Sequence, residues 1–98
     1  MGLFFETWEI NDPDKMEEHD AVCREWILEW VHSHLGKSAV PHKLYSQADN
    51  PVGRALSVEV ESKAEMDKLM ETLFANEKFR EYYEKWEKFI DEPPKRMF

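Results

Sequence analysis

The longest run of regularly spaced apolar residues extends from Ser62 to Asp91 and predicts a helical stretch. Ser62 and Glu65 form a capping-box sequence at its start. Asn76-Glu77 interrupts the pattern and can break or re-cap the helix, and Pro93-Pro94 ends it. The second half presents a mainly aromatic face: Phe79, Tyr82, Tyr83, Trp86, Phe89 and Ile90. Such a face needs a broad apolar surface to cover, which favours packing against a sheet.

The first third of the chain predicts a strand followed by a helix. Leu3 to Ile10 carries large apolar residues at both parities, which is typical of a central strand covered on both faces. Asp12-Pro13 suits a helix start, so we expect a helix from Pro13 to Leu35 that Gly36 closes in the left-handed conformation. One face of this helix holds Met16, His19, Cys23, Trp26, Ile27, Trp30, Val31 and His34.

Two further strands are predicted from Val40 to Ala48 and from Arg54 to Glu61, where apolar and polar residues alternate. A five-residue turn from Asp49 to Gly53 would join them as a hairpin with the even-numbered residues of both strands on one face. The tail from Lys95 to Phe98 is long enough to pair at a sheet edge.

This order of elements predicts an α+β fold, namely a ferredoxin-like βαββαβ sandwich in which both helices cover one face of an antiparallel sheet. Residues 1–98 contain no repeat or linker and are expected to form a single domain. The second face of the sheet would mix aromatic and charged side chains. Because a lone protomer rarely exposes such a surface, we expect a second copy to cover it in a homodimer.

Composition excludes several classes of partner. The net charge of -8 and the scattered Lys and Arg residues argue against nucleic acid and anionic membrane surfaces. No apolar run is long enough to span a bilayer, and Met1 to Ile10 lacks the features of a signal peptide. Cys23 is the single cysteine and forms no intrachain disulfide, which favours a cytoplasmic location.

The residues predicted to line a ligand pocket are aromatic or polar side chains beside the expected cleft between sheet and helices: Trp8, Trp26, Trp30, His34, His42, Tyr45 and Tyr82. His42 fits a hydrogen-bonded core residue equally well, and core packing explains most of the aromatic residues. His19 and Cys23 are spaced as two metal ligands can be, but two ligands make no site. Neither a metal nor a cofactor is therefore expected.

No reaction can be assigned from short motifs. Glu6, Glu9 and Glu59 raise the question of paired carboxylates, but an ion pair explains Glu59 better than a general base. The three glycines form no phosphate-binding loop, and no serine has the context of a nucleophile.

Two segments resemble the dimeric α+β barrel superfamily, particularly its small NIPSNAP-like and antibiotic-biosynthesis-monooxygenase-like members. They are FFETWEI near the start and SVEVESKAEMDKLMETLFANEKFREYYEKWEKFIDEPPKRMF from Ser57 to Phe98. The resemblance implies a homodimer whose two sheets meet as a barrel, with a cleft for a small, mostly apolar molecule. Some members are cofactor-independent oxygenases and others act on haem. The haem-acting branch carries a histidine on the second helix, and this chain has none between Ser62 and Phe98.

Three functions stay open from the sequence. The leading one is a homodimer that binds a small apolar or aromatic molecule and, if it is an enzyme, resembles the cofactor-independent monooxygenases. The first alternative is a non-catalytic protein-interaction module, which predicts no cavity. The second alternative is a metal- or haem-binding protein, in which His34 or His42 would be a ligand.

Overall fold

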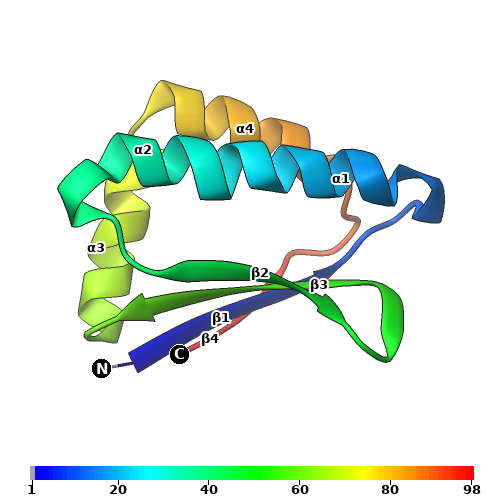
Figure 1. The fold of residues 1–98 in the computed structure, drawn as a ribbon, viewed down its shortest axis with the longest axis horizontal. Helices are drawn as coiled ribbons and strands as arrows, with labels where there is room; N and C mark the ends of the chain where they lie inside the picture. Colours follow the sequence, from blue (N-terminus) through cyan, green and yellow to red (C-terminus); the bar gives the residue numbers. More distant parts are fainter. Residues whose placement is uncertain (1) are drawn as a thin grey trace.

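The computed structural model describes residues 2–98 and has the predicted ferredoxin-like α+β fold. Its sheet contains β1 (Gly2–Glu9), β2 (His42–Gln47), β3 (Asn50–Val60) and β4 (Lys95–Met97). The four strands are antiparallel in the order β2-β3-β1-β4, so β1 is an inner strand and the C-terminal segment pairs at the edge, as predicted. Figure 1 shows all helices on one side of this sheet.

The first helical run begins after Asp12, whose side chain accepts a hydrogen bond from the backbone N–H of Asp14. It consists of η1 (Pro13–Lys15), α1 (Met16–Cys23), η2 (Arg24–Val31), α2 (His32–Leu35) and η3 (Gly36–Ser38). Gly36 has a positive φ of 55°, as predicted, but its ψ of −118° lies outside the predicted left-handed helical conformation. The sequence did not predict that η2 is a π-helix of eight residues. Such segments are rare and often occur at functional sites.

The second helical stretch is two helices, α3 (Lys63–Phe74) and α4 (Glu77–Glu87). The Ser62 hydroxyl accepts a hydrogen bond from the Glu65 N–H, and the Asn76 side chain re-caps the chain at α4. In Figure 1, α3 runs steeply at one end of the molecule, whereas α4 lies beside the first helical run. The interruption at Asn76-Glu77 is therefore the point where the helical stretch turns.

The β2–β3 hairpin differs in one detail from its prediction. His42 pairs with Val58 and Leu44 with Leu56, so the even-numbered residues share a face as expected. However, β3 already begins at Asn50, which pairs with Gln47, and the register shifts between Ser46 and Gln47. The predicted five-residue turn is wrong, because a tight turn and a β-bulge join the two strands instead. Together they contain the residues that the longer turn was expected to hold.

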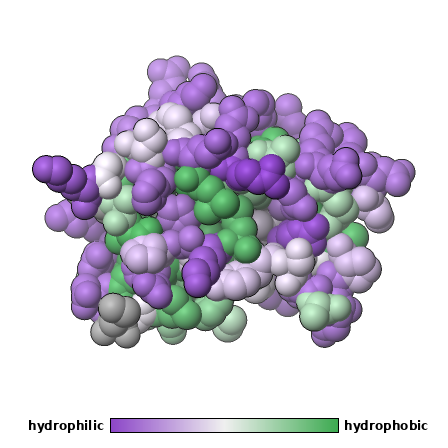
Figure 2. All heavy atoms as spheres, in the orientation of Figure 1, coloured by the Kyte–Doolittle hydropathy of each residue, from purple (hydrophilic) through white to green (hydrophobic). Residues whose placement is uncertain are grey.

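The two faces of β1 differ sharply. Phe4, Glu6 and Trp8 are buried toward the helices, whereas Leu3 is 40% exposed on the opposite face. Met97 pairs with Phe5 and is also exposed, as is Tyr45 of β2. Figure 2 shows hydrophobic residues as separate patches at the centre and the lower left of this face, below a largely hydrophilic helix surface.

The buried core lies between the sheet and the helices. Its larger part joins Trp8 to the aromatic residues of the helices, and a smaller part joins Phe4 and Val58 to Met66 of α3. Within residues 2–98, no helix is both long and apolar enough to cross a membrane.

Candidate functional site

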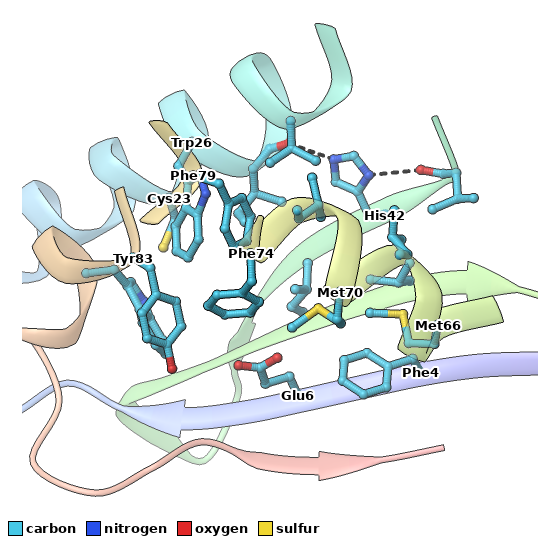
Figure 3. Close-up of a pocket in the computed structure, with 18 of the residues that line it drawn as sticks. Phe4, Glu6, Cys23, Trp26, His42, Met66, Met70, Phe74, Phe79 and Tyr83 are labelled. Carbon is cyan, nitrogen blue, oxygen red and sulfur yellow. Dashed lines mark hydrogen bonds between the residues drawn. The ribbon is translucent and has the colours of Figure 1, made fainter. Parts of the chain in front are cut away.

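An apolar cavity of about 80 Å³ lies inside this core, between β1 and β3 on one side and the helices on the other. Figure 3 shows side chains from the sheet, the first helical run, α3 and α4 converging on it. Aromatic, aliphatic and sulfur-containing side chains make up most of its lining, among them Phe4, Val58, Met66, Met70, Leu73, Phe74 and Phe79. Concave apolar sites with few polar groups are typical of binding sites for small molecules.

Glu6 is the buried carboxyl group of this cavity. The alternation of β1 points Glu6 toward the helices between Phe4 and Trp8, and only 8% of its surface is exposed. Burial raises the pKa of Glu6 because the charged form loses its hydration, and Arg96 offsets part of that effect. The raised pKa makes Glu6 able to donate or accept a proton closer to neutral pH than an ordinary glutamate.

Arg96 and Tyr83 complete the polar end of the cavity. Glu6 and Arg96 are directly paired across β1 and β4, and the Arg96 Nε lies 3.5 Å from the Glu6 Oε2. Tyr83 of α4 lines the cavity near Glu6, as Figure 3 shows. Burial and the Glu87 carboxylate raise the pKa of Tyr83, so its phenol stays protonated. The cavity thus has a neutral phenol beside a carboxyl group that is paired with the positive charge of Arg96.

Trp26 forms part of the opposite, helical wall. It belongs to the π-helical segment η2, is 5% exposed, and lines the cavity. Phe79, Tyr83 and Trp86 surround its ring with centroid distances of 5.1, 6.0 and 6.0 Å. These contacts hold the indole in place.

His42 lines the cavity from β2 and ties that strand to η2. Its two ring nitrogens each lie 2.9 Å from a backbone carbonyl oxygen, one of Val40 and one of Ile27. Carbonyl oxygens only accept, so an imidazole with one N–H donates to one of these two oxygens at a time, according to its tautomer. His42 therefore couples the π-helical segment to the sheet at the rim of the cavity.

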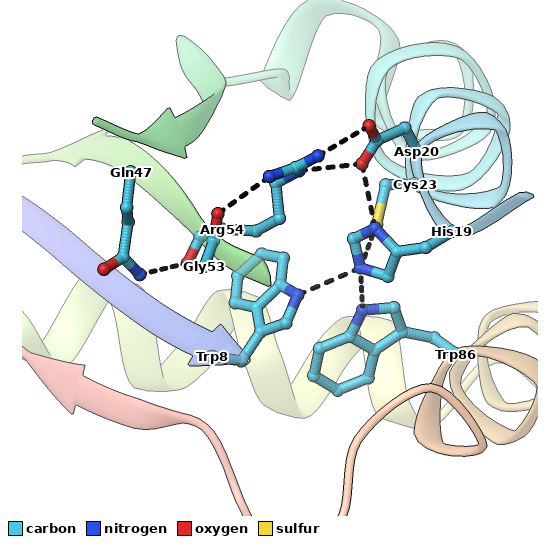
Figure 4. A network of polar contacts seen from close by, with 8 residues as sticks. All are labelled: Trp8, His19, Asp20, Cys23, Gln47, Gly53, Arg54 and Trp86. Carbon is cyan, nitrogen blue, oxygen red and sulfur yellow. Dashed lines mark hydrogen bonds and ion pairs between the residues drawn. The ribbon is translucent and has the colours of Figure 1, made fainter. Parts of the chain in front are cut away.

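A second polar cluster centres on His19, which is 1% exposed (Figure 4). Its Nε2 accepts hydrogen bonds from the indole N–H groups of Trp8, at 2.9 Å, and Trp86, at 3.2 Å. Nε2 is therefore unprotonated, and Nδ1 carries the proton that it donates to Asp20 at 3.0 Å. Burial lowers the pKa of His19, although Asp20 opposes that change.

Asp20 and Arg54 anchor this cluster at the protein surface. The Arg54 guanidinium donates to both carboxylate oxygens of Asp20, at 2.9 and 3.0 Å. Burial alone would raise the pKa of Asp20, but the hydrogen bonds from Arg54 and His19 outweigh it and lower that pKa. Cys23 lies 3.5 Å from the His19 Nε2, and burial raises the pKa of its thiol to about 12. The cysteine is a protonated core residue, not a nucleophile.

The structure brings three of the seven predicted pocket residues to the cavity: Trp8, Trp26 and His42. The other four lie elsewhere. Tyr82 donates a hydrogen bond to Glu25, and Tyr45 lies 43% exposed on the outer face of the sheet. Trp30 stacks on His34 with centroids 4.8 Å apart, and His34 is exposed, so its predicted place on the packing face is wrong.

Sequence reasoning did not select Glu6, Tyr83 or Arg96 for the pocket. A signal for Glu6 was present, because a charged residue stood at an inward parity between two large apolar residues of a predicted central strand. Arg96 had no such signal, since it reaches the cavity through a three-residue edge strand. Which of Tyr82 and Tyr83 lines the cavity depends on the rotation of α4 about its axis, and the sequence pattern does not determine that rotation.

The histidines do not form a metal site. Both nitrogens of His19 are already engaged, and those of His42 face carbonyl oxygens. Among the residues that the structure describes, no three His, Cys, Asp or Glu side chains converge as metal ligands. The side chains that line the cavity therefore offer no free imidazole nitrogen to a metal or a haem iron, and His34 lies exposed outside the cavity.

The chain was also compared with known proteins. No family model and no curated protein matches it. Solved structures do match: a NIPSNAP family protein from Agrobacterium tumefaciens has a TM-score of 0.76 at 12% identity, covering 98% of this chain and 90% of that one. An antibiotic biosynthesis monooxygenase has a TM-score of 0.68 at 13% identity, covering 98% and 94%.

A third match is a dimeric ferredoxin-like protein from an uncultured marine organism, with a TM-score of 0.72 at 16% identity over 97% of this chain and 82% of that one. At these identities the likeness concerns the fold. The chain has the ferredoxin-like fold that the NIPSNAP family protein and the antibiotic biosynthesis monooxygenase share, which confirms the resemblance drawn from its sequence at the level of structure.

Proposed function

We propose that the protein binds a small, mostly apolar molecule between its sheet and its helices. The observation that carries this proposal is the cavity, which is largely apolar and has polar side chains at His42 and at the end formed by Glu6, Tyr83 and Arg96. A protein core is normally packed to crystal-like density, and a charged residue is rarely placed inside it without use. The rival interaction module requires no cavity, and the cavity therefore favours ligand binding.

The size of the cavity sets the size of the ligand. Its volume of about 80 Å³ is smaller than the roughly 150 Å³ of an engineered cavity that holds benzene. Met66 and Met70 form part of the wall on α3, and methionine side chains adapt easily to a bound molecule. We therefore expect a ligand of about one ring, with these two methionines moving to admit it.

Binding is tested by adding benzene to protein with isotope-labelled methionine methyl groups. We expect the methyl resonances of Met66 and Met70 to shift with increasing benzene, because both side chains line the cavity. Leu69→Phe enlarges another wall residue and should abolish the shifts, whereas Leu28→Phe alters an exposed residue outside the cavity and should not. Unmoved resonances, or equal shifts in the Leu69→Phe protein, would contradict the proposal.

A second candidate function is proton-transfer catalysis at the same site, with a monooxygenase-like reaction. Two observations favour it: the buried Glu6 carboxyl with its raised pKa, and the antibiotic biosynthesis monooxygenase among the similar structures. In this role Glu6 would remove a proton from the bound molecule, and the apolar surroundings would keep water away from the resulting anion. Incubation of candidate substrates in heavy water tests it, since Glu6→Gln should abolish any deuterium exchange that the wild type catalyses.

We also propose that two copies associate through the outer faces of their sheets. Leu3, Tyr45 and Met97 are exposed there at 40%, 43% and 60%, which is a large apolar contribution for a free surface. The dimeric ferredoxin-like protein among the similar structures supports this arrangement. A cytoplasmic location remains a prediction from the single cysteine.

Dimerisation is tested by sedimentation at micromolar concentration. The wild-type chain should sediment as twice its mass of 11.8 kDa. Tyr45→Glu combined with Met97→Glu should give single chains, because charged residues would have to be buried between the sheets. Ala21→Glu adds a charge at an exposed position of α1, away from this surface, and serves as the control. A wild type that sediments at 11.8 kDa would refute the dimer.

A further inference from the structure

One end of the cavity reaches the surface at the edge of the sheet. Arg96 lies in the edge strand β4, and its side chain is 44% exposed although it lines the cavity. It pairs directly with Glu6 of β1, and the side chains of directly paired residues lie on the same face of a sheet. Arg96 therefore stands on the helix side of the sheet, at the point where the cavity meets solvent.

The Glu6 carboxyl group is buried but borders open space. Figure 3 shows it projecting from β1 into the cavity. Among the described residues its one polar contact is with Arg96, whose Nε lies 3.5 Å from Oε2, so Oε1 has no partner. Oε1 is nevertheless not enclosed by the core, because the one fully enclosed side-chain nitrogen or oxygen without a partner in residues 2–98 is Trp26 Nε1. The Glu6 carboxyl group is therefore open to a hydrogen bond with a bound molecule.

Glu6, Tyr83 and Arg96 together form a donor-rich end of the cavity. Burial raises the pKa of both Glu6 and Tyr83, and Arg96 opposes the change in both, so the three groups are close neighbours. A neutral carboxyl group and a phenol each have an O–H donor, and a guanidinium has several N–H donors. When Glu6 is neutral, the positive charge of Arg96 has no compensating negative charge at this end.

We propose that the ligand is the anion of a small carboxylic acid with an apolar ring, whose carboxylate binds Arg96 and Glu6 while the ring occupies the cavity. This ligand class rests on the proposed binding function and specifies the polar group of the ligand. The ligand carboxylate supplies the negative charge that Arg96 lacks beside a neutral Glu6, and it accepts the Glu6 O–H. The two carboxyl groups then share one proton, because a second negative charge beside the first is unfavourable. An ammonium group is disfavoured at the same place, since it would lie beside the Arg96 cation.

Benzoate and nitrobenzene test the charge of the ligand, because they have the same shape and differ in a carboxylate against a neutral nitro group. Their dissociation constants are measured by titration at about pH 6, where a carboxylic acid of ordinary pKa is ionised. We expect the preference for benzoate to fall about tenfold in Arg96→Gln, because charge-assisted hydrogen bonds are lost. Comparing the ratio of the two constants between proteins cancels the difference in hydration of the probes.

Lys95→Gln is the matched control, because it removes an equal charge from the same strand. Lys95 pairs with Thr7, whose side chain faces away from the helices, so it lies on the outer face of the sheet. Its exposed charge is screened by salt, and its removal should leave the preference for benzoate nearly unchanged.

A second measurement follows the shared proton. Between pH 5 and pH 9 the wild type should bind benzoate more weakly as Glu6 ionises. Glu6→Gln should keep its affinity, because the amide stays neutral and still has an N–H donor. Tyr83 from α4 and Cys23 from α1 also face Glu6, but burial raises their pKa values and keeps them neutral through most of this range, and Arg96 from β4 stays charged.

The outcomes separate the ligand class from the binding function. An unchanged preference in Arg96→Gln, or an equal pH dependence in the wild type and Glu6→Gln, would overturn the carboxylate ligand. Methyl shifts of Met66 and Met70 with benzene would still support the binding function in that case. If benzene, nitrobenzene and benzoate all fail to bind, both proposals are overturned.

Discussion

Replacing His19 by phenylalanine is expected to lower the free energy of unfolding by about 3 kcal/mol. Phenylalanine keeps an aromatic ring at this position, but the indole N–H groups of Trp8 and Trp86 both lose their acceptor inside the core. Each buried donor left unpaired costs about 1–3 kcal/mol. The Asp20 carboxylate also loses one of its donors, although it keeps Arg54.

Urea unfolding at pH 8 measures this loss, and a double variant tests its cause. Trp86→Phe removes one of the two donors, so adding it to His19→Phe should cost less than it costs in the wild type. His34→Phe is the matched control, because His34 is exposed and should change the stability by less than about 0.5 kcal/mol. Additive losses in the double variant would show that the indole hydrogen bonds do not explain the effect.

The same residue should make stability depend on pH. In the unfolded chain His19 becomes protonated near its ordinary pKa of 6.5. In the folded protein it stays neutral down to a lower pH, because burial lowers its pKa. Below pH 6.5 the unfolded state therefore binds more protons, and the free energy of unfolding falls as the pH is lowered. His19→Phe should lose this part of the pH dependence, and His34→Phe should keep it.

Most of the fold could be predicted because it follows from local patterns. The alternation in β3, the cap at Ser62 and the glycine at position 36 each specify a backbone conformation that only nearby residues decide. The π-helical segment could not be predicted in this way. Its side chains have the spacing of an ordinary helix in the sequence, and its wider turn is accompanied by contacts with distant residues such as His42.

The candidate site was harder to predict because it depends on which groups are left without partners. His19 and Trp26 lie on the same predicted helix face, but the first is fully hydrogen-bonded and the second has a free donor. No spacing distinguishes them, since the partners of His19 come from β1 and α4. The pairing of Glu6 with Arg96 likewise depends on the register of two strands that are far apart in the chain.

Glu6→Gln is expected to stabilise the protein increasingly as the pH rises above 4.5, the ordinary pKa of a glutamate. Burial raises the pKa of Glu6, so over this range the folded state holds a proton that the unfolded state has released, and the free energy of unfolding of the wild type falls with pH. The slope can reach about 1.4 kcal/mol per pH unit until the folded carboxyl ionises. Glutamine does not ionise and removes this slope.

Urea unfolding from pH 4 to pH 9 measures the difference between the two proteins. The groups that face Glu6 are Arg96 from β4, Tyr83 from α4 and Cys23 from α1, and the last two stay neutral through most of this range because burial raises their pKa values. Arg96→Gln removes the positive charge, which should extend the falling limb to higher pH. Glu9→Gln, exposed on the same strand, should leave the curve unchanged.

The free energies of unfolding of Glu6→Gln and the wild type could instead run parallel with pH. Glu6 would then be ionised in the folded protein and paired with Arg96, which would contradict its proposed role in proton transfer. If Glu6→Gln is instead more stable than the wild type at higher pH, the buried carboxyl group of Glu6 lowers the stability of the folded protein. Glutamine fits the same space without the cost of a buried charge, so the fold alone does not require the carboxyl group. Residues that cost stability in this way are characteristic of binding and catalytic sites, where function requires a group that the core does not.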